Sequence, residues 1–307
     1  MNKQKSIAHI SAFTTIIVWG TTFIATKILL ESFQPIEILV IRFIIGYLGL
    51  ALYDLLVSRK KGVVKAKTTF KEEALFALAG ASGVLMYYML ENFALMFTYA
   101  SNVGILVSLA PLTTALLAFI FIKEEPLRLN FIVGFVIATF GAFFVMFNGQ
   151  INLKLSIKGD ILALLATLGW AIYSITLKKI GSTELPVTTY TRKIFFWGIL
   201  FMIPGAIITN FSLRLNSFTL INTLLIAFLG LGASATCFVS WNYAVKILGV
   251  LKTSAYIYLT PLVSLFTAAL VLGEKVTLMA FIGCLMILAG LYLSEGKVSQ
   301  RLKLKGS

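Results

Sequence analysis

Charged residues are scarce in this 307-residue sequence, at 12% of the chain, whereas a soluble domain carries roughly 25%. Because the surface of a soluble domain must face water, this shortage indicates that most of the surface faces lipid. Hydrophobic residues make up 59% of the chain and the mean hydropathy is +0.95. A membrane-spanning helix needs about 20 apolar residues. The length therefore fits ten spans joined by short connections and excludes a large soluble domain.

Side chains that bind metals or react covalently are also few. The sequence has one histidine, His9, and two cysteines, Cys237 and Cys284, which lie far apart inside apolar segments. A zinc or haem site and a disulfide framework are therefore not predicted, and we expect no cofactor. A glycine-rich phosphate-binding loop is missing, so ATP is not expected to drive this chain directly. A membrane-embedded enzyme usually shows clusters of histidine and acidic residues, so we predict that the protein is not an enzyme.

Long apolar runs recur along the whole chain with short polar segments between them. Alternation of apolar and polar residues over ten-residue units, which is typical of outer-membrane barrels, is absent. The sequence predicts an all-α polytopic membrane protein. Its ten spans are expected at 8–30, 36–57, 73–97, 100–122, 129–147, 159–179, 187–209, 219–245, 250–272 and 277–295.

Basic residues predict the orientation of these spans. The chain has 26 lysines and arginines against 12 acids, a formal charge of +14. In a soluble protein this excess would indicate nucleic acid as a partner, but in a membrane protein it follows the bias of cytoplasmic loops towards lysine and arginine. With a cytoplasmic N-terminus, eighteen basic residues fall on the inside and four on the outside. We therefore expect a multi-pass protein of the inner membrane with both termini in the cytoplasm and no nucleic-acid partner.

The sequence repeats itself with an offset of about 150 residues. Matching positions include Trp19 and Trp170, Pro35 and Pro186, Gly80 and Gly230, Asn92 and Asn242, and Pro111 and Pro261. We predict a first repeat at 8–147, a second at 159–295 and a basic cytoplasmic tail at 296–307. Because each repeat holds an odd number of spans, the second enters the membrane inverted relative to the first. Inverted repeats place a shared binding site near the middle of the bilayer.

The same residues carry a resemblance to a known family. Trp19-Gly20 in the first span, Trp170 in the sixth, and the segments Pro111–Glu124 and Pro261–Glu274 resemble the EamA-type family of the drug/metabolite transporter superfamily. The resemblance covers about residues 8–295. It implies ten spans, cytoplasmic termini and export of amino acids, nucleobases or other metabolites.

A buried charge is costly in a membrane and needs a partner or a path for water. Glu91 is the one carboxylate well inside an apolar segment. At 1.5 Å per residue it lies about 10 Å from the outer end of the third span. Arg42 is expected at nearly the same depth, with Lys27 within reach. We predict that Glu91 and Arg42 could pair, either as a static ion pair or as a group that exchanges its partner for a proton or a substrate ammonium.

Aromatic and polar side chains predict the lining of a central cavity. Indole and phenol rings suit apolar or planar groups and cations. Prolines in the middle of the fourth and ninth spans should kink them, as hinges or as fixed architecture; these are Pro111 and Pro261. The predicted substrate-binding residues are Trp19, Tyr88, Glu91, Asn92, Trp170, Trp241, Asn242 and Tyr256.

These observations predict a carrier, by uniport or proton antiport, that exports amino acids or similar small metabolites by alternating access. We expect a small-molecule substrate, protons as a candidate coupling ion, the lipid bilayer as surroundings and a monomer. An alternative is a transporter of anionic substrates such as organic phosphates or nucleotide sugars, with Lys27, Arg42, Arg192 and Lys193 as the binding cations. A membrane enzyme or a channel fits the sequence less well.

Overall fold

The computed structural model describes residues 3–61, 68–97, 100–122, 129–147, 156–212, 215–272 and 277–295. These residues are almost entirely helical, and no strand occurs among them. The helices are α1 (Lys3–Leu29), α2 (Pro35–Lys61), α3 (Phe70–Ala79), η1 (Gly80–Met86), α4 (Tyr87–Phe97), α5 (Ala100–Val107), α6 (Ala110–Phe121), α7 (Leu129–Phe147), α8 (Ile157–Ile180), α9 (Val187–Ile208), η2 (Leu215–Ser217), α10 (Leu220–Ala227), η3 (Phe228–Thr236), α11 (Cys237–Leu248), α12 (Val250–Ala255), η4 (Tyr256–Leu259), α13 (Thr260–Leu272) and α14 (Leu278–Glu295).

These elements form the ten predicted spans across the described residues. Spans three, four, eight and nine are each built from consecutive pieces, namely α3–η1–α4, α5–α6, α10–η3–α11 and α12–η4–α13. Six continuous stretches are long and apolar enough to cross a membrane, and α6, α7 and α14 are shorter apolar helices. The prediction of an all-α polytopic membrane fold is confirmed. The predicted tail at 296–307 lies outside the described residues.

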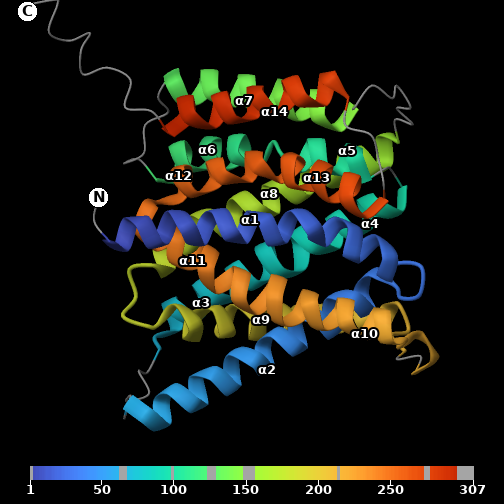
Figure 1. The fold of residues 1–307 in the computed structure, drawn as a ribbon. Helices are drawn as coiled ribbons and strands as arrows, with labels where there is room; N and C mark the ends of the chain where they lie inside the picture. Colours follow the sequence, from blue (N-terminus) through green and yellow to red (C-terminus); the bar gives the residue numbers. More distant parts are fainter. Residues whose placement is uncertain are drawn as a thin grey trace, which may run out of the picture.

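The two halves run through the bundle in opposite directions. The C-terminal part of α2 meets the N-terminal part of α9, because Asp54 and Arg192 form an ion pair. Since α8 ends just before α9 begins, α8 ends at the side of the bundle where α1 begins (Figure 1). The five helical spans of the second half are therefore inverted relative to the first five.

The first two spans of each half pack against the third span of the other half. α1 and α2 pack against span eight, through α11 and η3 respectively, whereas α8 and α9 pack against span three, through α4 and η1. The molecule therefore contains two interlocked groups, each of which combines two helices of one half with the third span of the other. The fifth and tenth spans, α7 and α14, lie along each other at one side of the bundle (Figure 1).

Glycines allow α7 and α14 to touch backbone to backbone. A Cβ atom built on Gly283 would lie 2.6 Å from the carbonyl oxygen of Gly141, and one built on Gly141 would lie 2.7 Å from the carbonyl oxygen of Gly283. Gly290 approaches Gly134 in the same way, at 2.5 Å. Apolar side chains gain little by packing together in lipid, so membrane helices associate through such close contacts of small residues.

Interruptions occur at equivalent places in the two halves. Spans three and eight each contain a π-helical segment, η1 and η3, directly before the residues that face the centre. In span four, α5 ends at Val107, the residue whose carbonyl would accept a hydrogen bond from position 111 in a continuous helix. Pro111 has no N–H to make that bond and its ring clashes with the carbonyl. Pro261 likewise follows the 3-10 segment η4, so both prolines lie at breaks.

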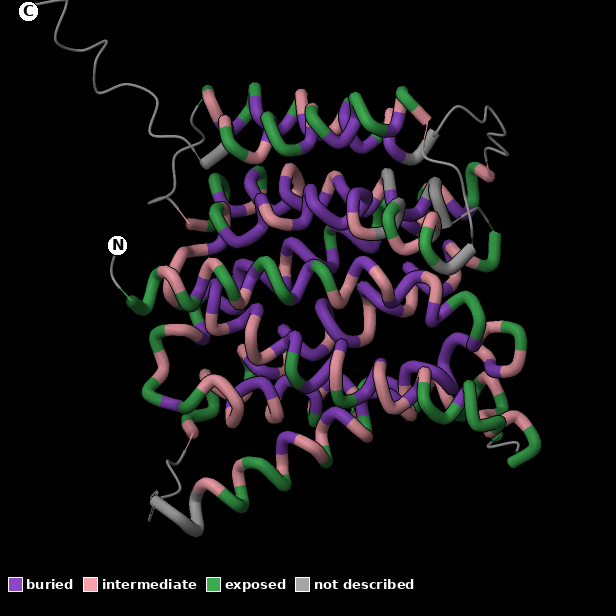
Figure 2. Tube along the Cα trace, in the orientation of Figure 1, coloured by how far each residue is buried: buried purple, intermediate pink, exposed green. Residues whose placement is uncertain are grey.

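Large apolar side chains cover the outside of the bundle. Exposed examples come from several helices, such as Leu48 and Leu52 of α2, Phe119 of α6 and Phe140 of α7. Figure 2 shows buried positions concentrated in the centre and exposed ones on the outer helices. Water would disfavour so extensive an apolar surface, whereas lipid tails tolerate it. The hydrophobic surface therefore faces the bilayer.

Candidate functional site

A cavity lies at the centre of the bundle, where the two halves meet. It has a volume of about 40 Å³. Because one water needs roughly 10–15 Å³ by this measure, the cavity has room for a few waters and is too small for a metabolite. Five spans line it through Ile16, Trp19, Thr22, Phe23, Tyr87, Tyr88, Glu91, Val107, Ala110, Trp170, Ile257 and Thr260. Four of the eight residues predicted to bind substrate are among them: Trp19, Tyr88, Glu91 and Trp170.

Two indoles from opposite halves form one wall of the cavity. The ring centroids of Trp19 and Trp170 are 5.3 Å apart in an edge-to-face arrangement. The Trp19 indole donates a hydrogen bond to the carbonyl oxygen of Ala233 at 2.9 Å, which holds that ring in place. The Trp170 indole nitrogen is buried without a hydrogen-bond partner. The Trp170 N–H group can therefore donate a hydrogen bond to a ligand in the cavity.

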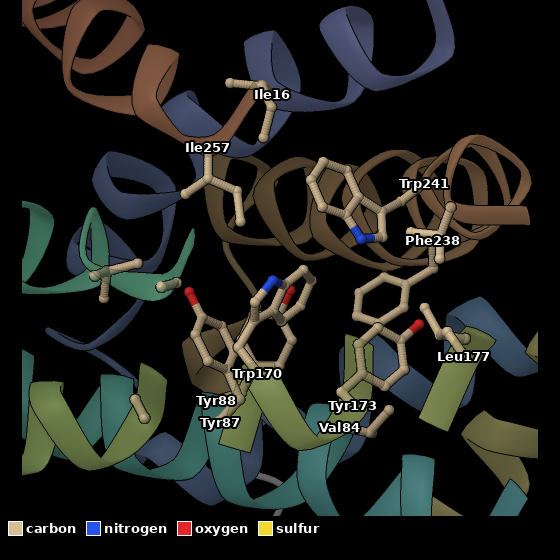
Figure 3. Packing of buried hydrophobic residues seen from close by; sticks show 14 of the residues in the cluster. Ile16, Val84, Tyr87, Tyr88, Trp170, Tyr173, Leu177, Phe238, Trp241 and Ile257 are labelled. Carbon is tan, nitrogen blue, oxygen red and sulfur yellow. The ribbon is translucent and has the colours of Figure 1, made fainter. Parts of the chain in front are cut away.

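A second layer of rings supports these indoles. Trp241 is fully buried, with its ring centroid 5.2 Å from that of Trp19 and 5.8 Å from that of Trp170. Phe238, one turn earlier on α11, contacts the same two rings. Figure 3 shows Trp170 of α8 facing Phe238 and Trp241 of α11. The structure therefore places Trp241 behind the lining, where it supports the two indoles.

Glu91 is the one acid among the described lining residues. It is 5% exposed, and the Tyr87 hydroxyl on the preceding turn hydrogen-bonds to its carboxylate. Sequence reasoning missed Tyr87, although residues four apart lie on one face of a helix. Lipid surrounds the bundle, so a carboxylate here is stabilised only by groups such as this hydroxyl and a nearby cation.

Arg42 is that cation, and an aromatic ring covers it. Its Nε donates a hydrogen bond to the Ser234 Oγ at 3.0 Å, and its guanidinium lies 4.6 Å from the centre of the Tyr88 ring. The charges of Arg42 and Glu91 attract each other, but the ion pairs recorded in the described parts of the chain involve other residues. One terminal nitrogen of Arg42 is buried without a hydrogen-bond partner. Arg42 is thus a buried cation, directly behind the cavity wall, with one N–H group that can still donate a hydrogen bond.

Lys27 and Tyr256, two other residues predicted to belong to the site, lie away from the cavity. Lys27 is exposed near the end of α1, so the structure does not bring it to Glu91. Tyr256 accepts or donates a hydrogen bond with the His9 imidazole at 2.7 Å. It begins the 3-10 segment η4, in which successive residues turn further than in an α-helix. That turn places Ile257 and Thr260 at the cavity, where the α-helical period had indicated Tyr256.

Asn242, which was also predicted to bind substrate, holds helices together. Its Oδ1 accepts a hydrogen bond from the Tyr173 hydroxyl at 2.7 Å, and its Nδ2 donates one to the Thr191 Oγ1 at 2.9 Å. These bonds join α11 to α8 and α9. Asn92, its counterpart 150 residues earlier, is 1% exposed and neither atom of its side-chain amide has a hydrogen-bond partner. At the offset of 151 residues that relates Trp19 to Trp170, the positions equivalent to Tyr173 and Thr191 are Thr22, whose hydroxyl donates to the Trp19 carbonyl oxygen at 2.7 Å, and Val40, which carries no hydroxyl.

This asymmetry predicts opposite effects of one substitution at two matched positions. Asn242→Leu strands the Tyr173 hydroxyl in the core and should lower the free energy of unfolding by about 1–3 kcal/mol. The Thr191 hydroxyl loses the amide donor but keeps its own bond to the Val187 carbonyl oxygen. Asn92→Leu removes a buried amide that already lacks partners, so its stability should be unchanged or higher. Chemical unfolding of both variants in the same detergent measures the difference. Equal losses at the two positions would contradict the assignment.

The cations of the anionic-substrate alternative do not form one site. Arg192 pairs with Asp54 at 2.9 Å, and Lys193 pairs with Glu73. Both pairs lie where the end of α2 meets the beginning of α9, whereas Arg42 is buried at the centre of the bundle. With Lys27 exposed elsewhere, the four basic residues cannot clamp one phosphate.

Comparison with known proteins agrees with this architecture. A model of the EamA-like transporter family matches residues 6–147 and again 157–295. An uncharacterized transporter of Archaeoglobus fulgidus is 27% identical over 301 residues, covering 97% of this chain and all of the relative. A protein of Streptantibioticus cattleyicolor named as a probable terminal-alkyne amino-acid exporter is 28% identical over 284 residues, covering 91% and 90% of the two chains.

A solved structure shares the fold. It superposes with a TM-score of 0.75 at 19% sequence identity, covering 94% of this chain and 97% of that one, and its description reads only "crystal structure of protein". The family model matches both halves of the sequence, from the beginning of α1 to the end of α14. This chain therefore belongs to the EamA-like transporter family.

Proposed function

We propose that this transporter exports an amino acid, or a small metabolite with an amino group, across the cell membrane by alternating access. One observation carries the proposal: Glu91, the one carboxylate among the described lining residues, lies in an aromatic cavity between two inverted halves. Burial without water strengthens the attraction between a carboxylate and an ammonium group. Rings such as Trp19 and Trp170 suit the apolar side chain of a substrate. The name of the Streptantibioticus relative supports the same class of cargo.

Opposite ends of an amino acid would meet different residues. Glu91 receives the ammonium group, since it faces the cavity directly. Arg42 receives the carboxylate through its unpaired terminal nitrogen, once the Tyr88 ring that covers it turns aside. Charge-assisted hydrogen bonds of this kind are about twice as strong as neutral ones. A proton on Glu91 would take the place of the ammonium on the return step, which makes protons the coupling ion.

A cavity of about 40 Å³ requires its walls to separate before such a substrate can enter. We assign this motion to the two interlocked groups, α1–α2 with span eight and α8–α9 with span three, because the cavity lies between them. The breaks before Pro111 and Pro261 interrupt the helical hydrogen bonds of spans four and nine, so these spans can bend as hinges. We assign the cytoplasmic side to the end of the bundle where α1 begins, because most basic residues lie there.

Ligand-induced stabilisation of the purified protein tests the class of substrate. Amino acids should raise the apparent melting temperature, whereas sugar phosphates should leave it unchanged. The Trp170→Ala variant should bind the active compound about tenfold more weakly, and Phe140→Ala, an exposed ring on α7 outside the cavity, should bind it normally. Counterflow of the same compound in proteoliposomes then distinguishes a carrier from a channel. Stabilisation by organic phosphates alone would contradict the proposal.

A further inference from the structure

A second pocket lies on the lipid-facing side of the bundle, between α2, α3 and α9. Its volume is about 290 Å³, and its lining residues are Tyr47, Glu73, Arg192, Lys193 and Phe196. Figure 1 shows α2 diverging from the bundle towards its C-terminal end, which leaves a wedge beside α9. The pocket lies in that wedge and is separate from the central cavity, with which it shares no lining residue.

The guanidinium group of Arg192 uses only part of its hydrogen-bonding capacity in this pocket. The Glu73 carboxylate is occupied by Lys193, by the Trp197 indole at 3.0 Å and by the Thr68 hydroxyl at 2.6 Å. Arg192 uses only its Nε, which donates to the Asp54 Oδ2 at 2.9 Å. Within the described residues, its two terminal nitrogens have no hydrogen-bond partner, and the side chain is 28% exposed. A guanidinium fork held in this way is suited to two oxygens of a phosphate.

The surroundings of this fork are amphipathic. The two helices beside it, α2 and α9, also carry exposed apolar side chains, among them Leu48 and Leu52 of α2 and Leu200 of α9. Lys71, exposed in the first turn of α3, adds a further positive charge. A phosphate with a negative net charge and hydrocarbon chains matches both features. Basic pockets between helices on the cytoplasmic side are suited to anionic lipid headgroups.

We infer that this wedge binds the phosphodiester headgroup of an anionic phospholipid. Arg192 holds the phosphate with its two terminal nitrogens, and Asp54 holds Arg192 in that orientation. The rings of Tyr47 and Phe196, whose centroids are 6.4 Å apart, lie beside the glycerol region, and the acyl chains follow the outer faces of α2 and α9. A bound lipid fills the space between α2 and α9 and fastens α2 to the bundle. This inference does not depend on the identity of the transported substrate.

Native mass spectrometry of the protein in detergent, titrated with phosphatidylglycerol or with diacylglycerol of the same acyl chains, which lacks the phosphate, tests the inference. We expect one site with a preference of about tenfold for phosphatidylglycerol, the size expected for a charge-assisted hydrogen bond. Arg192→Lys preserves a cation for Asp54 but removes the fork, so the preference should fall to near unity. Lys158 lies in the first turn of α8, beside the Phe97 ring and away from the wedge. Lys158→Gln therefore removes a cation elsewhere and should leave the preference unchanged.

The other outcomes overturn the inference. Equal binding of the two lipids, or a preference that survives Arg192→Lys, would show that lipid only coats the protein without a site in the wedge. Glycerol phosphate, which has the headgroup chemistry without acyl chains, separates lipid from a free anion. If glycerol phosphate displaces phosphatidylglycerol at equal concentration, the wedge is a soluble-anion site. Melting temperatures of all variants confirm that they remain folded.

Discussion

Replacing Glu91 with glutamine is expected to reduce transport by about tenfold to a hundredfold while the protein remains folded. The substitution keeps the size of the side chain and its hydrogen bond with Tyr87, but removes the charge that would hold a substrate ammonium. A hydrogen bond to a charged group contributes about 1.5–3 kcal/mol, which corresponds to the stated loss. Because glutamine cannot take up a proton, the transport rate should also lose its dependence on pH. Uptake into proteoliposomes across a range of pH values measures both effects.

A matched control is Glu31→Gln, which makes the same chemical change at an exposed position after α1. Its transport rate and pH dependence should equal those of the unmodified protein. Two results would count against the role of Glu91. A Glu91→Gln variant with an unchanged rate would exclude it from substrate binding, and a variant with a reduced rate but an unchanged pH profile would exclude it from proton coupling.

Gly283→Ala should destabilise the fold by about 1–3 kcal/mol, the usual cost of forcing an extra group into a packed interior. The added Cβ atom would lie 2.6 Å from the backbone oxygen of Gly141, so α14 would have to move away from α7. Gly141→Ala should cost nearly the same, because its contact with Gly283 is reciprocal. The double variant should lose less than the sum of the two, since either substitution alone already separates the helices.

Thermal unfolding in detergent measures these changes, with Gly205→Ala as the control. A Cβ atom on Gly205 would meet its nearest neighbours at 3.7 Å, both of them ends of flexible side chains. This substitution should therefore be neutral or slightly stabilising, since alanine favours helix more than glycine does. If Gly283→Ala were as harmless as Gly205→Ala, the close packing of α7 on α14 would be wrong.

Sequence reasoning predicted the fold because its signals are local. Apolar runs of span length, loops rich in lysine and arginine, and an odd number of spans per repeat can all be counted along the chain. They indicated the helical membrane class, the ten spans and the inversion of the second half. The same helical period placed Trp19, Tyr88, Glu91 and Trp170 at the centre, where all four line the cavity.

Departures from the α-helical period limited the prediction of the site. The 3-10 turn η4 rotates Ile257 and Thr260 towards the cavity in place of Tyr256. Trp241 has the expected direction but lies one layer behind, because Trp19 and Trp170 fill the space before it. Periodicity specifies the direction of a side chain and leaves open what lies between it and the cavity.

The sequence by itself determined where the chain crosses the membrane and which half mirrors which, because hydrophobicity and charge act on each segment separately. Only the tertiary structure decided which polar groups are paired. Asn242 meets Tyr173 and Thr191, whereas Asn92 at the matching position meets no partner. Arg192 meets Asp54 from 138 residues away, and Arg42 meets Ser234 across the two halves. Such pairs depend on distances of about 3 Å between a donor atom on one helix and an acceptor atom on another. Those distances exist only once the whole bundle has packed.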